Sequence, residues 1–308
     1  MDIYLFLDRP SHNCGIHGIK PTTGRLSRHG TSTGRNSILG FLPGFVCFGP
    51  MARYISDLEY ALEVLSGPDS SDPYTFIPPF TAQPNTLPKK IAYFWDDGNE
   101  PEVDDSIKKA IKLVIEVLKK EDIELIEDVP SAFSQASELM YRLCGYDNLE
   151  VIQTIEPSTN TIRKFMNEMV EADFGINTKQ ELEALEDDIT LYKQEMGEFF
   201  EKYDALITPT STFPALKPEQ TFSSEYERGY SHFRFTYAWN VAEFPAMVVG
   251  SISKASSKEF KGLPVSIQIV VPPFKEDVAF SIAKLLEQKI ELVSTLHPSF
   301  SKVIRDEL

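Results

Sequence analysis

The sequence is poor in cysteine, lacks long apolar runs and carries no excess of positive charge. Its three cysteines, Cys14, Cys47 and Cys144, are too few and too scattered for a disulfide framework, which favours a reducing compartment. No apolar run is long enough to span a bilayer, and Tyr4–Leu7 is too short for the core of a signal peptide. The formal net charge of -16 disfavours nucleic acid or an anionic membrane as a partner. We therefore expect a cytoplasmic protein.

Two short acidic segments have simple interpretations. The last four residues, Arg305–Leu308, resemble an endoplasmic-reticulum retrieval tail, but such a tail is read only in the secretory pathway, and we interpret it as coincidence. The acidic residues between positions 181 and 188 fit a solvated helix face, because no calcium-loop pattern accompanies them. The sequence therefore predicts no metal and no cofactor.

Length and hydrophobic content predict a folded chain. The 308 residues are 42% hydrophobic, which is enough to fill a sizeable core. We expect one domain over residues 1–308. The six prolines between positions 68 and 88 predict a surface connection. The first fifty residues are rich in Gly, Ser and Thr, and this composition predicts ordered loop with short strands instead of helix.

Helix signals begin at Ser56. Ser56 and Glu59 have the spacing of a capping box, and Gly67 with Pro68 ends the pattern. The apolar stripe of this helix consists of Leu58, Leu62 and Leu65. Further along, residues 131–202 read as mostly helical, with breaks near Pro157 and Gly175.

A strand, a helix and a second strand follow one another between positions 90 and 126. The strands are predicted at Lys90–Phe94 and Ile123–Ile126, and the helix between them has one apolar face. That face consists of Ile107, Ile111, Val114, Ile115 and Leu118. Such a unit places the two strands parallel in one sheet.

Three more strands and a helix are predicted after residue 204. Ala205–Thr208 is a short apolar strand that should end at Pro209, which has no N–H for a ladder. Phe244–Ile252 and Leu263–Val271 are the others, and the second is apolar enough to be buried on both faces. Asp277–Gln288 reads as a covering helix. The chain therefore reads as α/β, with a mixed sheet flanked by helices.

Four sequence blocks, in order, resemble the amidase-signature family. The stretch 14–25, CGIHGIKPTTGR, is similar to the end of the signature itself. GPMAR at 49–53 follows, then the strand ending in Thr208-Pro209, and then a fourth block made of the two stretches 240–246 and 262–268. Within the family, the likeness is to fungal acetamidase-like members. The motif positions that we assign a structural role are Cys14, Gly15, Gly18, Lys20, Pro21, Gly24, Pro245, Gly262, Pro264 and Gln268.

The motif residues also predict local geometry. Gly15 and Gly18 permit a positive φ or a close backbone approach, as a tightly wound loop requires. Two positions depart from the family pattern. Glu243 stands where a small residue is usual, and Ser266 stands where the family often has Gly. Both departures alter the surroundings of a family-like pocket.

The resemblance implies amide hydrolysis by a serine nucleophile, a second serine and a lysine. It places the lysine and the second serine well upstream of residue 14, outside this sequence. The nucleophile's position falls at about Phe6, and residues 1–10 contain no serine and no Gly-Gly pair to stabilise an oxyanion. Ser11 follows Pro10, where the family does not place its nucleophile. We therefore predict no catalytic residue in this chain and an incomplete amidase-signature fold.

Other chemical constellations are weaker. His12, Cys14 and His17 lie close in sequence, but no further ligands complete a tetrahedral metal site. No papain-like signature surrounds Cys14. Trp95 and Trp239 read as core or loop anchors.

Three hypotheses follow for function. The first is a truncated amidase, a pseudoenzyme with no hydrolase activity of its own. The second is the C-terminal half of a split active amidase whose other half is a partner chain. The third is a non-enzymatic binding or scaffolding protein that reuses the fold. In each case the ancestral ligand is a small amide, and self-association could cover exposed sheet edges.

A remnant of the substrate pocket is also predicted by resemblance. Gly49, Pro50 and Met51, together with the loop near Asn240, should line it beside the segment Cys14–Lys20. These positions are expected on loops at strand ends, where α/β proteins usually bind ligands.

Overall fold

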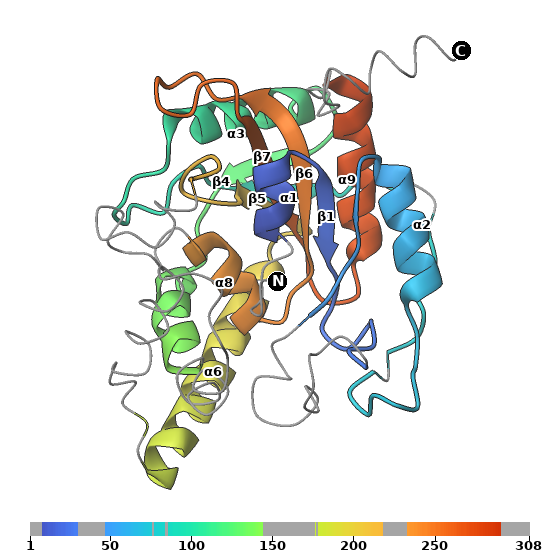
Figure 1. The fold of residues 1–308 in the computed structure, drawn as a ribbon, viewed down its shortest axis with the longest axis vertical. Coiled ribbons are helices and arrows are strands. Elements are labelled where there is room, and N and C mark those ends of the chain that lie inside the picture. Colours follow the sequence, from blue (N-terminus) through green and yellow to red (C-terminus); the bar gives the residue numbers. More distant parts are fainter. Residues whose placement is uncertain are drawn as a thin grey trace.

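The structure, a computed structural model, describes residues 8–29, 47–75, 77–83, 86–143, 176, 178–217 and 233–290. Among these residues a seven-stranded sheet has the order β2-β1-β6-β7-β5-β3-β4 (Figure 1). The strands are β1 (His17–Lys20), β2 (Met51–Ala52), β3 (Lys90–Tyr93), β4 (Glu124–Glu127), β5 (Ala205–Pro209), β6 (Ala246–Lys254) and β7 (Pro264–Val270). The helices are α1 (Asp8–Cys14), α2 (Ile55–Leu65), α3 (Asp105–Leu118), the 3-10 turn η2 (Phe133–Gln135), α6 (Lys179–Phe200), α8 (Arg234–Val241) and α9 (Glu276–Lys289). The predicted α/β class is confirmed.

The predicted parallel unit is confirmed. β3 and β4 pair in parallel, and α3 crosses between them. Every apolar residue predicted on the inner face of α3 is buried, and the side chain of Asp104 caps the helix by accepting from the N–H of Ser106 at 2.8 Å. β5 also pairs in parallel with β3, whereas β5, β7, β6, β1 and β2 pair antiparallel to one another, which makes the sheet mixed.

The register shows which side chains share a face of the sheet. Gly18 pairs with Val248, Val248 with Gln268, and Gln268 with Thr208, so all four point the same way. A Cβ at Gly18 would lie 2.1 Å from Oγ of Ser11 in α1, so α1 covers this side. We call it the α1 face. Figure 1 shows α1 lying across β6 and β7.

The opposite face is apolar. It carries Ile19, Met247, Ile269 and Ile207, which occupy one row across four strands and are all fully buried. The helices α2, α9 and α3 pack on this side. β7 is buried along its length apart from its first residue, as its sequence predicts.

The prediction of loop for the whole of the first fifty residues is wrong at Asp8–Cys14, which form α1. The physical reason is that α1 is buried without an apolar stripe. Asp8, Arg9, Ser11 and His12 are its buried residues, so hydrophobic periodicity could not reveal the helix. Packing against the sheet supplies the stability that a helix of 7 residues lacks by itself.

Three further details differ from prediction. α2 begins at Ile55 with Tyr54 as its N-cap and has no side-chain cap, so the predicted capping box is wrong. Leu65 is 58% exposed because it lies on the outer side of the last turn. β5 includes Pro209, opposite Ile267 of β7, because proline is compatible with a strand end. The breaks predicted near Pro157 and Gly175 lie outside the described residues.

A matched pair of glycines tests the packing of the turn between α1 and β1 on the sheet. A Cβ at Gly250 of β6 would lie 2.3 Å from the carbonyl oxygen of Ile16, whereas one at Gly197 of α6 would meet nothing within 4 Å. We expect Gly250→Ala to destabilise the fold by about 2 kcal/mol or more through backbone displacement. Gly197→Ala should stabilise it by about 0.5–1 kcal/mol, as in any helix interior. Urea denaturation measures both, and equal effects would contradict this packing.

Candidate functional site

The segment from Cys14 to Lys20 turns from α1 into β1. Gly15 makes the turn with φ 65, and Gly18 lies under Ser11, so both geometric expectations for these glycines are confirmed. Oγ of Ser251 donates to the carbonyl oxygen of Gly15 at 2.6 Å. The N–H of Gly250 donates to Nδ1 of His17 at 3.2 Å, and burial lowers the pKa of His17 to about 4. His17 is therefore a neutral structural residue at neutral pH.

Two buried groups of opposite charge accompany this segment, Asp8 in the helix before it and Lys20 at its end. Asp8 is 1% exposed, and within the described part of the chain neither of its carboxylate oxygens has a hydrogen-bond partner. Lys20 is 2% exposed, and its Nζ makes a long contact of 3.4 Å to the carbonyl oxygen of Pro21. Burial raises the pKa of Asp8 to about 7, and the charge of Lys20 partly opposes the rise. Asp8 stands two positions after the Phe6 slot, and Phe6 itself lies outside the described residues.

The raised pKa of Asp8 predicts a pH-dependent gain from Asp8→Asn. An acid whose pKa is higher in the folded state than its ordinary 3.8 destabilises the fold increasingly as pH rises from about 4 to 7. The variant should equal the parent near pH 4 and be more stable by on the order of 2–4 kcal/mol at pH 8. Burial lowers the pKa values of His12 and His17, so these two residues make stability rise with pH, which is the opposite trend. The parent and the variant share both histidines, so the difference between the two proteins reports on Asp8. Urea denaturation at pH 4, 6 and 8 measures the difference.

The exposed Asp187 provides the control for this prediction. Asp187→Asn should change stability little at any of the three pH values, because its side chain is solvated in both the folded and the unfolded chain. A gain from Asp8→Asn that does not vary with pH would contradict burial of the ionised carboxylate.

The segment Gly49–Met51 lies directly against β1. The N–H of Ile19 donates to the carbonyl oxygen of Pro50 at 3.2 Å, and Met51 pairs with Gly18. The side chain of Met51 is 47% exposed. Asn240, expected on a loop, instead lies in α8 and is buried, because the helix that Arg234 begins runs through this position to Val241. A shared pocket formed by these positions stays a prediction.

The last two motif blocks build the centre of the sheet. Pro245 precedes β6, and its carbonyl oxygen accepts from the N–H of Val271 at 3.2 Å. Gly262, with φ 86, precedes β7, which begins at Pro264. Glu243 has φ 62, a conformation that favours glycine and therefore fits the small residue that is usual there. The carboxylate of Glu243 pairs with Lys193 at 2.7 Å.

A buried carboxylate ties the end of the signature segment to α9. Glu276, fully buried, accepts from the N–H and the hydroxyl of Thr22 at 2.9 and 2.7 Å. It also accepts from Nε and Nη2 of Arg25 at 2.8 and 3.1 Å. Gly24 lies between these two residues with φ 85. These hydrogen bonds therefore fix the chain after β1, at Thr22 and Arg25, to the first turn of α9.

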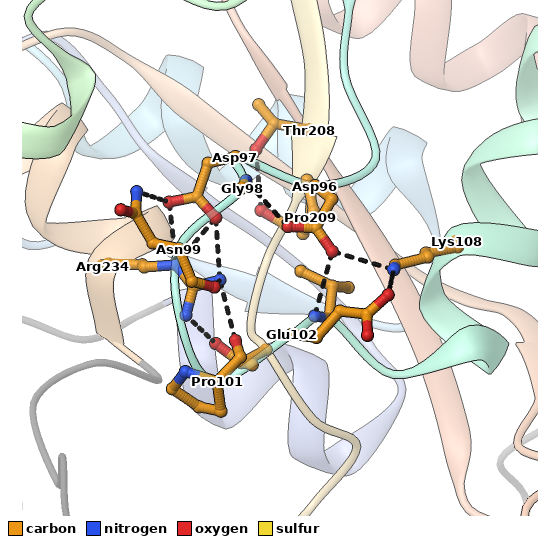
Figure 2. A network of polar contacts seen from close by, with 12 residues as sticks. Asp96, Asp97, Gly98, Asn99, Pro101, Glu102, Lys108, Thr208, Pro209 and Arg234 are labelled. Carbon is orange, nitrogen blue, oxygen red and sulfur yellow. Dashed lines mark hydrogen bonds and ion pairs between the residues drawn. The ribbon is translucent and has the colours of Figure 1, made fainter.

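A second ionic centre, which the sequence patterns did not predict, is built around Arg234 (Figure 2). Arg234 begins α8, and its Nε and Nη2 donate to the carboxylate of Asp97 at distances from 2.7 to 3.0 Å. Nη1 donates to Oγ1 of Thr212 at 3.1 Å, and Nη2 reaches the carbonyl oxygens of Asn99 and Pro101. This centre fixes the loop after β3 to the loop after β5. The sequence feature that could have indicated this centre is the Asp96-Asp97 pair just after a predicted strand.

Lys108 of α3 extends the same centre. Its Nζ contacts Asp96 at 2.8 Å and also pairs with Glu102 (Figure 2). The carboxylate of Asp96 accepts from the N–H of Val103 at 3.2 Å. The loop 95–104 is therefore anchored from both α8 and α3 at the carboxyl ends of the parallel strands, where α/β folds bind ligands.

The candidate nucleophiles and metal ligands are separated by the fold. Ser11 is fully buried against Gly18, whereas Cys14 is exposed at the end of α1. Within the described ranges no group of three His, Cys, Asp or Glu side chains could hold a metal ion. Trp239 is fully buried beside Phe133, with ring centroids 5.8 Å apart, so its core assignment is confirmed. Within the same ranges, no helix is long and apolar enough to cross a membrane.

Comparisons with known sequences match nearly the whole chain. The sequence model of the family described as Amidase matches residues 9–279. A glutamyl-tRNA(Gln) amidotransferase subunit of Clostridium novyi (strain NT) is 28% identical over 321 residues, covering 92% of this chain and 61% of the relative. The equivalent protein of Carboxydothermus hydrogenoformans (strain ATCC BAA-161 / DSM 6008 / Z-2901) is 29% identical over 320 residues, with the same coverage. The chain thus spans less than two thirds of these relatives' length.

Solved structures share the fold. 6-Aminohexanoate cyclic dimer hydrolase superposes with a TM-score of 0.73 at 20% identity, covering 92% of this chain and 62% of the other. Fatty acid amide hydrolase superposes with a TM-score of 0.70 at 22% identity, covering 92% and 55%. The mixed sheet and its covering helices are therefore an arrangement that this chain shares with known amide hydrolases.

Proposed function

Because the chain belongs to the amidase family, we propose that it serves in the hydrolysis of carboxylic acid amides but cannot catalyse that reaction through a serine of its own. The observation that carries the proposal is the segment before Cys14. Residues 1–10 contain no serine, and the residue two positions after the expected nucleophile is a buried, unpartnered carboxyl, Asp8. Activity then depends on a polypeptide segment outside this sequence, either upstream or in a second chain.

The burial of Ser11 supports the same proposal. An attacking hydroxyl must reach the substrate carbonyl and a base within hydrogen-bond distance. Ser11 is 0% exposed and lies against β1, so a substrate carbonyl has no approach to its oxygen. The buried His12, whose pKa is lowered to about 4 by burial, is engaged with the carbonyl oxygen of Phe213.

The proposal predicts no amide turnover by the purified chain of 308 residues. Loss of the nucleophile alone costs a serine protease on the order of a millionfold in rate, and residues 1–10 also offer no Gly-Gly pair to stabilise an oxyanion. Phe6→Ser should not restore activity, because an added hydroxyl without a base stays protonated. Ammonia release from a panel of small carboxamides measures the turnover by the unmodified chain and by Phe6→Ser. Turnover clearly above buffer by the unmodified chain would refute the proposal.

The split-enzyme and binding-protein hypotheses separate in one further experiment. If a second polypeptide supplies the lysine and serines, carboxamide turnover should appear when this chain is purified together with that polypeptide. A protein that only binds amides should show saturable binding of the same carboxamides in calorimetry, without turnover in either preparation.

A further inference from the structure

Four buried side chains in α1, in β7 and just after β5 have hydrogen-bonding atoms without a partner among the described residues. These atoms are Nδ1 of His12, Oγ1 of Thr210, Oγ of Ser266 and Oε1 of Gln268. All four residues are 0% exposed. Buried polar atoms are rarely left unpaired in folded proteins, and ordered water commonly pairs those that lack a protein partner.

The strand register brings three of these side chains together. Thr208 pairs with Gln268, and Pro209, the last residue of β5, pairs with Ile267, so Thr210 leaves the strand directly beside the position of Ser266. Residues two apart on a strand share a face, so Ser266 and Gln268 both lie on the α1 face, and Thr210 follows Pro209 next to them.

His12 approaches this row from α1, which packs on β6 and β7. Its Nε2 lies 3.1 Å from the carbonyl oxygen of Phe213, just beyond the end of β5. The His12 imidazole therefore connects α1 to the segment that follows Thr210 in the chain.

The hydrogen bonds that these side chains do make determine whether each remaining atom can donate or accept. Nε2 of Gln268 donates to the carbonyl oxygens of Pro209 and Phe235 at 2.9 and 2.7 Å, so its orientation is set and Oε1 remains as an acceptor. Nε2 of His12 must carry the proton that Phe213 accepts, so Nδ1 of the neutral ring is also an acceptor. Thr210 and Ser266 contribute hydroxyls, which donate and accept.

A ligand for this site must be neutral, very small and able to donate at least two hydrogen bonds. We propose that His12, Thr210, Ser266 and Gln268 form a buried site for a water molecule that links α1 to β5 and β7. Water donates to the two pure acceptors and exchanges hydrogen bonds with the two hydroxyls, and buried waters typically make about three such bonds. Ser266, where the resemblance expects Gly, supplies one of the four groups.

The sign of a stability change tests the proposal. Thr210→Val removes a hydroxyl with almost no change in shape. If the site holds water, the variant loses a hydrogen-bonded group and its Tm falls. If the site is dry, the variant removes an unpaired polar atom and its Tm rises or stays the same, which would overturn the proposal. Ser266→Ala should behave likewise.

A double variant and a crystal structure complete the test. Because one water serves both hydroxyls, the Tm losses of Thr210→Val and Ser266→Ala should sum to more than the loss in the double variant. Thr190→Val, whose hydroxyl bonds the carbonyl oxygen of Glu186 on α6, is the control and should add to Thr210→Val. A crystal structure should show a peak about 2.7–3.2 Å from Nδ1 of His12 and from at least one hydroxyl. Additive losses, or no such peak, would contradict the site.

Discussion

Arg234→Met is expected to destabilise the fold by about 3–5 kcal/mol, because it leaves a buried carboxylate without its partner. The side chains of Arg234 and Asp97 are only 6% and 1% exposed. The change also removes the donors that serve Thr212 and the carbonyl oxygens of Asn99 and Pro101. We expect faster hydrogen exchange in the loop 95–104 together with a lower urea midpoint.

Two companion variants make this result specific. Arg234→Lys keeps the charge but cannot reach all the acceptors as a planar guanidinium does, so its loss should be intermediate. Arg142→Met removes the same residue type from a pair with Asp188, whose side chain is 53% exposed, and should cost no more than about 1 kcal/mol. Equal losses for Arg234→Met and Arg142→Met would show that the Arg234 centre contributes nothing special.

Glu276→Gln is the second large effect that we expect, again about 3–5 kcal/mol. The substitution keeps the shape of the side chain but removes the charge opposite Arg25, whose side chain is 7% exposed. One carboxylate oxygen becomes an NH2 group, which cannot accept from Arg25 or Thr22. The joint between the segment 20–25 and α9 is therefore expected to open first.

Thermal and urea unfolding measure the stability loss, and hydrogen exchange at Thr22 locates it. Glu183→Gln is the matched control, because Glu183 pairs with Lys179 on the surface, where their side chains are 57% and 87% exposed. It should change stability by less than about 0.5 kcal/mol. Retained protection of the N–H of Thr22 in Glu276→Gln would contradict the role of this carboxylate.

The sequence was informative where apolar periodicity decides structure. The face of α3 from Ile107 to Leu118 identified the parallel unit, and the mostly apolar sequence of β7 identified the buried centre of the sheet. Gly15 and Gly18 identified a tight turn and a close approach, because only glycine fits both.

The missed features depend on contacts between distant residues. α1 is a buried helix with Asp8, Ser11 and His12 on its buried side, and no local pattern predicts that polar residues are buried. Arg234 lies 137 positions from Asp97, and a lone arginine in sequence reads as a surface residue. The unpaired atoms of Ser266 and Gln268 become visible only when the register and α1 are both known.

Labelling with a fluorophosphonate probe tests most directly whether the chain carries a catalytic serine. The probe reacts with serines that a base and an oxyanion hole have activated. We predict that the purified chain stays unlabelled under conditions that fully label an active serine hydrolase, and that Phe6→Ser stays unlabelled as well. Stoichiometric labelling of the unmodified chain, with the adduct mapped to Ser11 or to any other serine, would contradict the account.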